Sequence, residues 1–326
     1  MTILTATIWG GRISVVVDRQ LSRPTRFGLS VVNKEASKLL VAFCGNAIFA
    51  VTYTGVAVAD SIWMDEAIAS CLAFRKLESA MLQPGSWLLS RPVHELLNNL
   101  AFNLPIRLRT LPTIATQGLT LAVTGWHLRP RLQPFACELT WGKTAGQVGG
   151  SLGITRRQVA KHFKHFPGGL WLQALGDTGE RYEETMQDLA SSQGLTHDDI
   201  ERYVVEAIVA RSKETASVGE QCLALQLDPR DHDGQVQFTY YPGSIGADPH
   251  SFLTGWTLSP TMINSPTRES TSGSQYSSCN RYAVGGFSDS NSKLFIRTRL
   301  PIESMNHGGP VVISYATEKR NPPPTK

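Results

Sequence analysis

Apolar and β-branched residues cluster in short runs over the first fifty residues, and glycine-containing turns separate these runs. Such segments are typical of β-strands joined by hairpin turns. Residues 19–37, between the second and third of these runs, are polar and contain Pro24 and Gly28, so this stretch is predicted to be a loop. The predicted strands are residues 2–8, 12–17, 38–43 and 47–53.

Apolar residues then recur at helical spacing in four later segments, and further strand-like runs separate them. Asp60 is suited to cap the first helix, and Thr196 or His197 precedes the acidic first turn of the last one. The predicted helices are residues 61–81, 93–104, 179–193 and 197–212. The later predicted strands are residues 119–126, 135–141, 170–176, 221–228 and 236–241.

This order of strand runs separated by helix pairs predicts layers in which helices cover a sheet sandwich. We therefore expect an α+β fold, a four-layer αββα sandwich, in a domain of residues 1–242. The composition changes at residue 243, and residues 264–292 are dominated by Ser, Thr, Asn and Gly. Residues 243–326 are predicted to be a C-terminal extension, partly irregular, with strands only near 294–300 and 310–316.

Composition is typical of a soluble globular protein, since 18% of the 326 residues are charged and 41% are apolar. The formal net charge of +4 argues against a nucleic-acid-binding protein, which would concentrate basic residues on one face. No apolar run has the length of a membrane span, and no secretory signal is recognised at the start. Five scattered cysteines favour reduced thiols, so a cytoplasmic location is expected.

Several polar residues stand at the ends of the predicted strands. Thr2 opens the first strand, and Asp18 follows it by sixteen residues, at the end of the second. Two lysines are available before the third strand: Lys34 and Lys38, the latter followed directly by LLVAF. Further along, Gly55 stands two residues after the fourth predicted strand. Glu214, Ser217 and Gly219 lie in the polar turn that precedes QCLALQL.

In these residues the chain resembles proteasome-type subunits of the N-terminal-nucleophile hydrolases, in particular uncharacterised bacterial relatives. The resemblance covers roughly residues 2–240. In that family the mature chain begins with threonine, and an aspartate and a lysine follow. Lys34 has the family's spacing from Thr2, whereas Lys38 matches the local strand pattern, so both stay candidates. This chain departs from the family in carrying Glu214 where the family has aspartate, and in its insert at about 142–168.

The resemblance implies an amide hydrolase, most plainly a peptidase, that acts after removal of Met1. A free Thr2 would supply both the nucleophilic hydroxyl and, through its α-amine with a pKa of about 7.7–8.0, the general base. Asp18 and one lysine would tune the hydroxyl, and the Gly55 N–H would stabilise the oxyanion. Ser217 and Glu214 would support the amine, and Tyr53 is a candidate for the substrate pocket. No cofactor and no metal are implied.

Two other functions stay open on the sequence. The chain could be a catalytically inactive, proteasome-like scaffold or assembly subunit, and self-association into a homo-oligomer is one expectation. The segment SLGITRRQVAKHFKHF, with Arg156 and Arg157, could alternatively be a DNA-recognition helix near 154–166. A glycine-rich stretch precedes it where the first helix of such a motif should stand, which favours an ordinary basic surface helix.

Overall fold

The structure of the protein is a computed structural model. Within the ranges that it describes, the chain forms nineteen strands and four helices. These ranges are residues 2–33, 36, 38–44, 46–59, 62–72, 92–108, 118–128, 130–141, 155–158, 164–166, 169–191, 194–230, 236–241, 252–258, 279–285, 293–298 and 313–318.

The first large sheet has eight strands, and every neighbouring pair in it is antiparallel. The turn between its third and fourth strands in spatial order is Gly10-Gly11, as the sequence predicted, and both glycines have positive φ. In spatial order the strands are β12 (Lys164–Phe166), β13 (Leu170–Gly176), β1 (Ile3–Trp9), β2 (Arg12–Asp18), β14 (Cys222–Leu227), β15 (Val236–Tyr241), β18 (Lys293–Thr298) and β19 (Ile313–Glu318).

The second large sheet has seven strands. Its neighbours are antiparallel except for β5 and β16, which pair in parallel. In spatial order they are β11 (Thr155–Gln158), β10 (Gln133–Trp141), β9 (Leu119–His127), β6 (Ala47–Gly55), β5 (Leu39–Cys44), β16 (Phe252–Leu258) and β17 (Cys279–Gly285).

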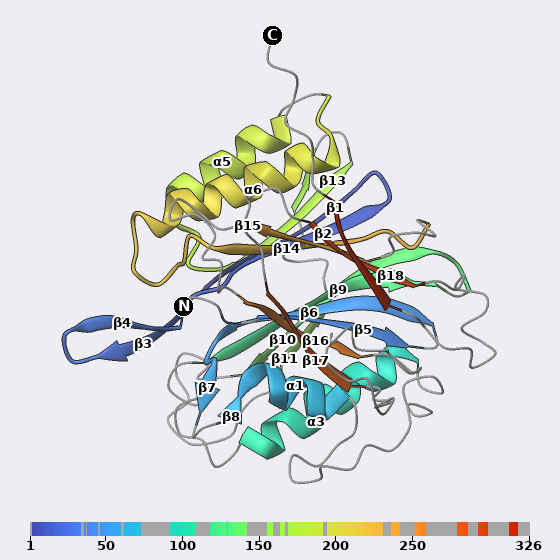
Figure 1. Ribbon diagram of the computed structural model, residues 1–326, viewed down its shortest axis with the longest axis horizontal. Helices are drawn as coiled ribbons and strands as arrows, with labels where there is room; N and C mark the ends of the chain where they lie inside the picture. The colour runs from blue at the N-terminus through green and yellow to red at the C-terminus, as the bar shows by residue number, and fades with distance from the viewer. Residues whose placement is uncertain are drawn as a thin grey trace.

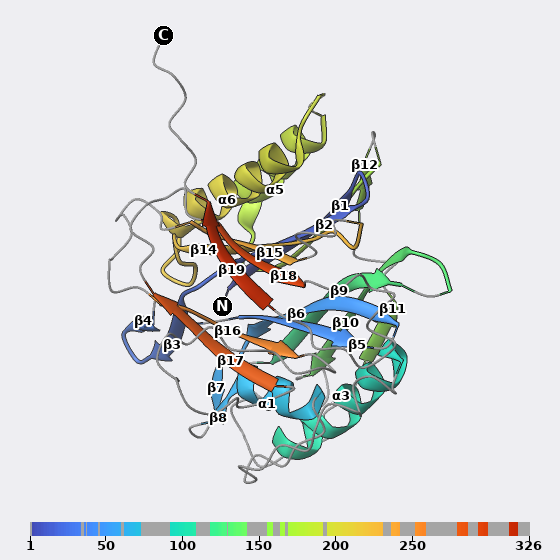
Figure 2. The same cartoon turned by 45° about the vertical axis from the view of Figure 1, so that its right-hand side comes forward.

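The two sheets pack face to face, and each also carries two helices on its outer face (Figures 1 and 2). Alternate residues of the strands fill the space between the sheets, among them Leu4, Val41 and Leu225. The opposite face of the first sheet packs on α5 (Gly179–Ser191) and α6 (His197–Ser212). The opposite face of the second sheet packs on α1 (Met64–Leu72) and α3 (Val93–Leu108).

The expected α+β class with a four-layer αββα sandwich needs correction. The described residues are mostly antiparallel sheet, and the helices are few. The first sheet packs on α6 mainly through β1, β2 and β14, with a hydrogen bond from Tyr241 of β15 to Glu201, and the sheet continues to β18 and β19 beyond them. Segments that were expected to be irregular form strands, and this shifts the balance towards β-structure.

The predicted loop 19–37 is one such segment. Most of it forms a hairpin of β3 (Leu21–Thr25) and β4 (Gly28–Asn33), which extends away from the body beside the N-terminus in Figure 1. Phe27 at its tip is 86% exposed, and the Arg26 guanidinium lies 4.6 Å from the centre of its ring. The polar side chains that suggested a loop are compatible with a hairpin because both of its faces meet solvent.

Two helices also differ from their predicted bounds. The helix expected over 61–81 begins only at Met64, because Ile62–Trp63 form β8, which pairs with β7 (Val58–Ala59). It is described as far as Leu72, and residues 73–81 lie outside the described ranges. The helix expected over 93–104 continues to Leu108, although the proline at 105 cannot donate a backbone hydrogen bond.

The C-terminal segment contributes strands to both large sheets. β16 and β17 extend the second sheet, and β18 and β19 extend the first. The irregular stretch expected at 264–292 contains β17 and lies mostly outside the described residues. The predicted division at residue 242 stays a prediction. None of the helices in the described ranges has the length and apolar character needed to cross a membrane.

Candidate active site

Three strand ends bring Thr2, Asp18 and Lys38 together. Thr2 directly precedes β1, Asp18 is the last residue of β2, and Lys38 directly precedes β5 in the other sheet. β1 and β2 are antiparallel neighbours, so the start of one lies beside the end of the other. The site therefore sits at one edge of the space between the sheets. All three side chains are buried, with Thr2 only 3% exposed.

The Asp18 carboxylate is held by hydrogen bonds to both of its oxygens. Oδ1 accepts the Ile3 N–H at 2.9 Å and also the Thr2 hydroxyl. Oδ2 accepts the backbone N–H groups of Gln20 at 3.2 Å and Gly219 at 3.1 Å. Lys38 Nζ completes the set at 3.0 Å from Oδ2. These bonds orient the carboxylate so that it faces both Thr2 and Lys38.

Lys38 is the centre of the constellation. Its Nζ donates to the Thr2 hydroxyl oxygen, to Asp18 and to the Gln20 carbonyl, and the side chain is 2% exposed. Burial lowers the pKa of Lys38 from its ordinary value, while the charge of Asp18 and its hydrogen bond act in the opposite direction. A buried ammonium with a lowered pKa is a stronger hydrogen-bond donor towards Thr2 than an exposed lysine.

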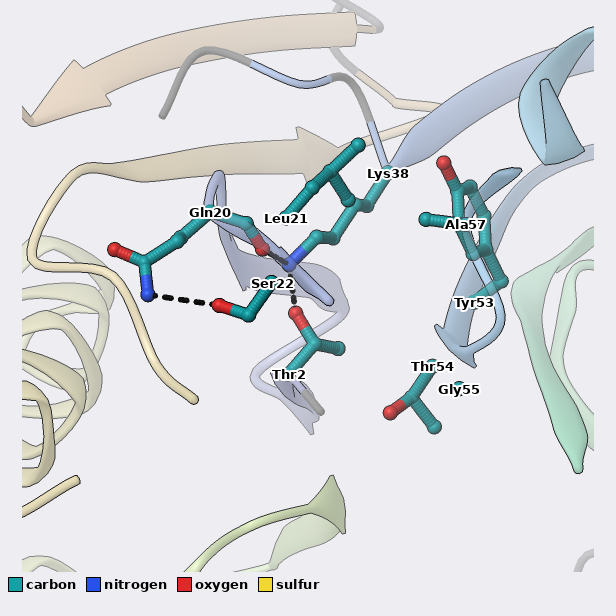
Figure 3. A pocket seen from close by; sticks show the side chains of 9 residues that line it. All are labelled: Thr2, Gln20, Leu21, Ser22, Lys38, Tyr53, Thr54, Gly55 and Ala57. Atoms are coloured by element: carbon teal, nitrogen blue, oxygen red, sulfur yellow. Dashed lines mark hydrogen bonds between the residues drawn. The ribbon is translucent and has the colours of Figure 1, made fainter. Parts of the chain in front are cut away.

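A small pocket opens beside Thr2, and Figure 3 shows its lining. Tyr53 stands across the pocket from Lys38, and burial raises the pKa of its phenol, which therefore stays neutral. Gly55 ends β6 with a φ of +104°, and a Cβ there would lie 2.3 Å from the Gly118 carbonyl oxygen. Only glycine fits that backbone. The nine lining residues are Thr2, Gln20, Leu21, Ser22, Lys38, Tyr53, Thr54, Gly55 and Ala57.

A second polar cluster lies beside Thr2, and Asp177 is its centre. The Asp177 N–H donates to the Thr2 carbonyl at 3.1 Å. Its carboxylate accepts the Ser217 hydroxyl through Oδ2 and the Arg211 guanidinium through Oδ1 at 2.6 Å. Burial alone would raise the pKa of Asp177, but hydrogen bonds from Ser217 and Arg211 outweigh it and lower that pKa. Asp177 is thus an ionised acceptor next to Thr2.

The sequence predicted Glu214 as the acid of this cluster and did not predict Asp177. Glu214 is exposed, and its carboxylate accepts Arg211 Nη1 at 2.8 Å. The acid bonded to Ser217 is Asp177. A signal was present in the sequence, since Asp177 directly follows the predicted strand 170–176, and the last residue of that strand, Gly176, pairs with Ile3.

The remaining predicted residues are placed as follows. Thr2, Asp18, Lys38, Tyr53 and Gly55 come together around the pocket or its base. Ser217 joins them through Asp177. Lys34, the other lysine candidate, lies outside the described residues.

The DNA-recognition helix near 154–166 is wrong. Thr155–Gln158 form β11, which pairs with β10, and Lys164–Phe166 form β12, which pairs with β13. A strand at the edge of each large sheet replaces the helix. Backbone hydrogen bonds to β10 and β13 stabilise these strands, and local helix propensity does not include such long-range pairing. The described part of the segment is therefore β-strand, which also corrects the ordinary basic surface helix expected there.

Comparison with known proteins gives no family. No family model matches the sequence, and no curated protein does. Several solved structures are similar, all at low identity. An Anbu Gly-1 mutant from Hyphomicrobium sp. strain MC1 is 10% identical, with a TM-score of 0.44 over 70% of this chain and 82% of that one. Anbu, the ancestral beta-subunit, from Yersinia bercovieri is 12% identical, with a TM-score of 0.40 over 69% and 81%.

The helical assembly of the Anbu complex from Pseudomonas aeruginosa is also 12% identical, with a TM-score of 0.43 over 70% of this chain and 81% of that one. The family assignment to proteasome-type subunits is therefore corrected, because no family model supports it and the similar structures are Anbu proteins at these low scores. Self-association and a cytoplasmic location stay predictions.

Proposed function

We propose that this protein is an N-terminal-threonine amide hydrolase that cleaves peptide bonds once Met1 has been removed. The observation that carries the proposal is the position of Lys38 Nζ, which donates to the Thr2 hydroxyl oxygen and lies 3.0 Å from Asp18 Oδ2. A threonine hydroxyl is a weak nucleophile and needs such neighbours. Three strand ends from two sheets converge on the Thr2 hydroxyl, an arrangement that is not expected for a threonine in an ordinary turn.

In the proposed reaction the Thr2 oxygen attacks the carbonyl carbon of a substrate amide. The hydroxyl proton passes to the Thr2 α-amine, and the Lys38 ammonium stabilises the oxygen as it loses that proton. The tetrahedral oxyanion accepts a backbone N–H, for which Gly55 at the pocket wall is the candidate. The C–N bond then breaks, and the amine gives its proton to the leaving nitrogen. Water hydrolyses the resulting ester and restores the Thr2 hydroxyl.

The amine has a suitable setting for this role. Its pKa in a free chain is about 7.7–8.0, so an appreciable minority is neutral near pH 7. The nearby Lys38 charge favours the neutral amine, whereas Asp18 and Asp177 favour the protonated one. A chain that retains Met1 has no such amine at Thr2. Catalysis therefore depends on exposure of Thr2 as the first residue.

The test is acylation of Thr2 by a β-lactone, whose ring opens as its acyl carbon bonds to the Thr2 oxygen. The protein is made with a cleavable fusion that leaves Thr2 first, and a matched sample retains Met1. We expect one added lactone mass, mapped to Thr2, only in the first sample, together with hydrolysis of fluorogenic peptide amides. Thr2→Ala should abolish both, and Thr2→Ser should retain labelling. Labelling that is absent, or unchanged in Thr2→Ala, contradicts the proposal.

An inactive scaffold predicts a different result in the same experiment. Thr2 would then stay unlabelled although the fold and the Lys38 contact are intact. A folded, Thr2-first protein that neither reacts with the lactone nor hydrolyses peptides would make the scaffold the better description.

A further inference from the structure

Arg211 joins the second polar cluster to the body of the protein. It lies in the last turn of α6 and meets two carboxylates at once. Its Nη2 lies 2.6 Å from Asp177 Oδ1, its Nη1 lies 2.8 Å from Glu214 Oε2, and its Nε donates to the Asp177 carbonyl at 3.2 Å. Because the guanidinium is planar, these three bonds fix its orientation as well as its charge.

The backbone next to Asp177 is shaped around this guanidinium. Gly179 has a φ of +69°, and a Cβ there would lie 2.7 Å from the Arg211 Cζ. A side chain at 179 would therefore push the guanidinium off Asp177. The start of α5 and the end of α6 meet at this contact, which is mostly shielded, since the Arg211 side chain is 20% exposed and that of Asp177 is 18% exposed.

Asp177 in turn is in contact with the nucleophile residue. Its N–H donates to the Thr2 carbonyl at 3.1 Å, so standard bond lengths place the Thr2 nitrogen within about 7 Å of the Asp177 backbone. Its other carboxylate oxygen, Oδ2, accepts the Ser217 hydroxyl and, at 3.4 Å, the Thr215 hydroxyl. A carboxylate that left Ser217 would bring a full negative charge towards the amine.

We propose that Arg211 is a positioning residue that holds the Asp177 carboxylate on Ser217 and balances its charge, and so sets the pH at which Thr2 becomes reactive. This inference rests on the proposed function. Without the guanidinium, the unbalanced carboxylate would favour the protonated amine, which cannot act as a base. Arg211 itself touches neither Thr2 nor the pocket, and it acts through Asp177 alone.

The charged groups around the amine come from several elements. Asp18 ends β2, Lys38 precedes β5, Asp177 follows β13, and Arg211 with Glu214 lies at the end of α6. In β14, burial raises the pKa of Cys222 well above its ordinary value, so its thiol stays neutral. Asp18 and Lys38 compensate each other at 3.0 Å. Arg211 is the cation that contacts Asp177, so its loss changes the charge that the amine experiences.

The experiment measures the rate of β-lactone acylation of Thr2 against pH, in the Thr2-first protein and in Arg211→Met. Methionine keeps the apolar stem and removes the charge. We expect the acid limb of the profile to move to higher pH by about one unit, which slows acylation about tenfold on that limb, with the plateau kept. Arg211→Lys should restore most of the shift. Arg202→Met is the matched control, since it removes an exposed guanidinium from the same helix and should leave the profile unchanged.

Thermal melting identifies variants that fold, and Gly179→Ala provides a second way to displace the guanidinium if Arg211→Met does not fold. Gly179→Ala should move the acid limb in the same direction. An acid limb that stays at the wild-type pH in a folded Arg211→Met overturns the inference, and so does a rate that falls equally at all pH values. If wild-type Thr2 is not labelled at all, the proposed function fails first, which distinguishes the two failures.

Discussion

Lys38 Nζ lies 3.0 Å from Asp18 Oδ2, and both side chains are almost completely withdrawn from water. Charges in such a setting are costly unless they are paired and hydrogen-bonded. Here the pair is also bonded to the Thr2 hydroxyl, which needs no such support in a purely structural strand. The arrangement therefore links the stability of the fold to the reactivity proposed for Thr2.

Removing one member of the pair should be more damaging than removing both. Asp18→Asn leaves a buried ammonium without its counter-charge, and we expect a loss of roughly 3–5 kcal/mol in the free energy of unfolding. The double variant Asp18→Asn with Lys38→Met removes both charges and should recover a large part of this loss. Urea unfolding of the wild type, the two single variants and the double variant gives the coupling energy.

The same variants separate stability from chemistry. β-Lactone acylation of Thr2 should be slowed by about 10²–10⁴-fold in Asp18→Asn, and the double variant should be no faster, although it is more stable. Recovery of the acylation rate together with stability would mean that the pair serves the fold only. Strictly additive losses of stability would mean that the two charges are not coupled.

Gly176 leaves room for the Thr2 carbonyl, and a comparison with Gly169 separates this steric role from the effect of a positive φ. Its φ is +103°, and a Cβ there would lie 1.7 Å from the Thr2 carbonyl oxygen. Gly169 has a φ of +81° with nothing within 4 Å of its would-be Cβ. Gly169→Ala should therefore cost only the backbone strain, about 1–2 kcal/mol. Gly176→Ala should cost more, and it should also displace Thr2 and slow acylation, whereas Gly169→Ala should not.

Thermal or urea unfolding measures both stability losses, and lactone labelling measures the effect on Thr2. Equal stability losses in the two alanine variants, with equal labelling, would show that the Thr2 carbonyl moves away at little cost. The close contact between β13 and the start of β1 would then be unimportant for the site.

Much of the site could be predicted because strand ends are local features. Thr2 and Asp18 flank one hairpin, so the turn at Gly10-Gly11 is enough to place them side by side. The lysine was ambiguous because spacing depends on the length of the segment between β2 and β5. That segment folds into the β3–β4 hairpin, and Lys38, which directly precedes β5, contacts Thr2.

Other features depend on contacts between distant parts of the chain. Glu214 lies near Ser217 in sequence, whereas Asp177 lies near it in space. Both carboxylates bind Arg211, at the point where α5 meets α6, and this contact sets the direction of each side chain. The strands near the C-terminus were underestimated for a similar reason. A strand such as β16 is stabilised by pairing with β5, more than two hundred residues earlier, and its own composition carries little of that signal.

Tyr53 should control the size of side chain that the pocket accepts. It lines the pocket opposite Lys38 and is 1% exposed. Tyr53→Ala enlarges the pocket, so we expect lactones with a bulky side chain to gain about tenfold in acylation rate relative to a lactone with a methyl group. Tyr53→Phe removes only the hydroxyl and is the control for volume. An unchanged ratio of the two rates in Tyr53→Ala would place the substrate side chain elsewhere.

The Asp177 carboxylate should make stability depend on pH in the acid range. Its pKa in the folded protein is lowered, whereas in the unfolded chain it returns to about 3.9. As the pH falls, the unfolded state takes up a proton first, so folding loses free energy. The contribution is fully present above the unfolded pKa and is lost as the pH falls through the folded pKa. Asp177→Asn has no such proton to take up.

We therefore expect the difference in unfolding free energy between wild type and Asp177→Asn to be constant from pH 7 to about pH 5. Below about pH 4 it should shrink. Urea unfolding at intervals from pH 7 to pH 3 measures it, with Arg211→Met as a partner variant that should show a weaker dependence because one of the groups lowering the pKa is gone. A difference that grows at low pH would mean that Asp177 is more easily protonated in the folded protein. The Arg211 and Ser217 contacts would then not hold it ionised, and the positioning role assigned to Arg211 would fail with them.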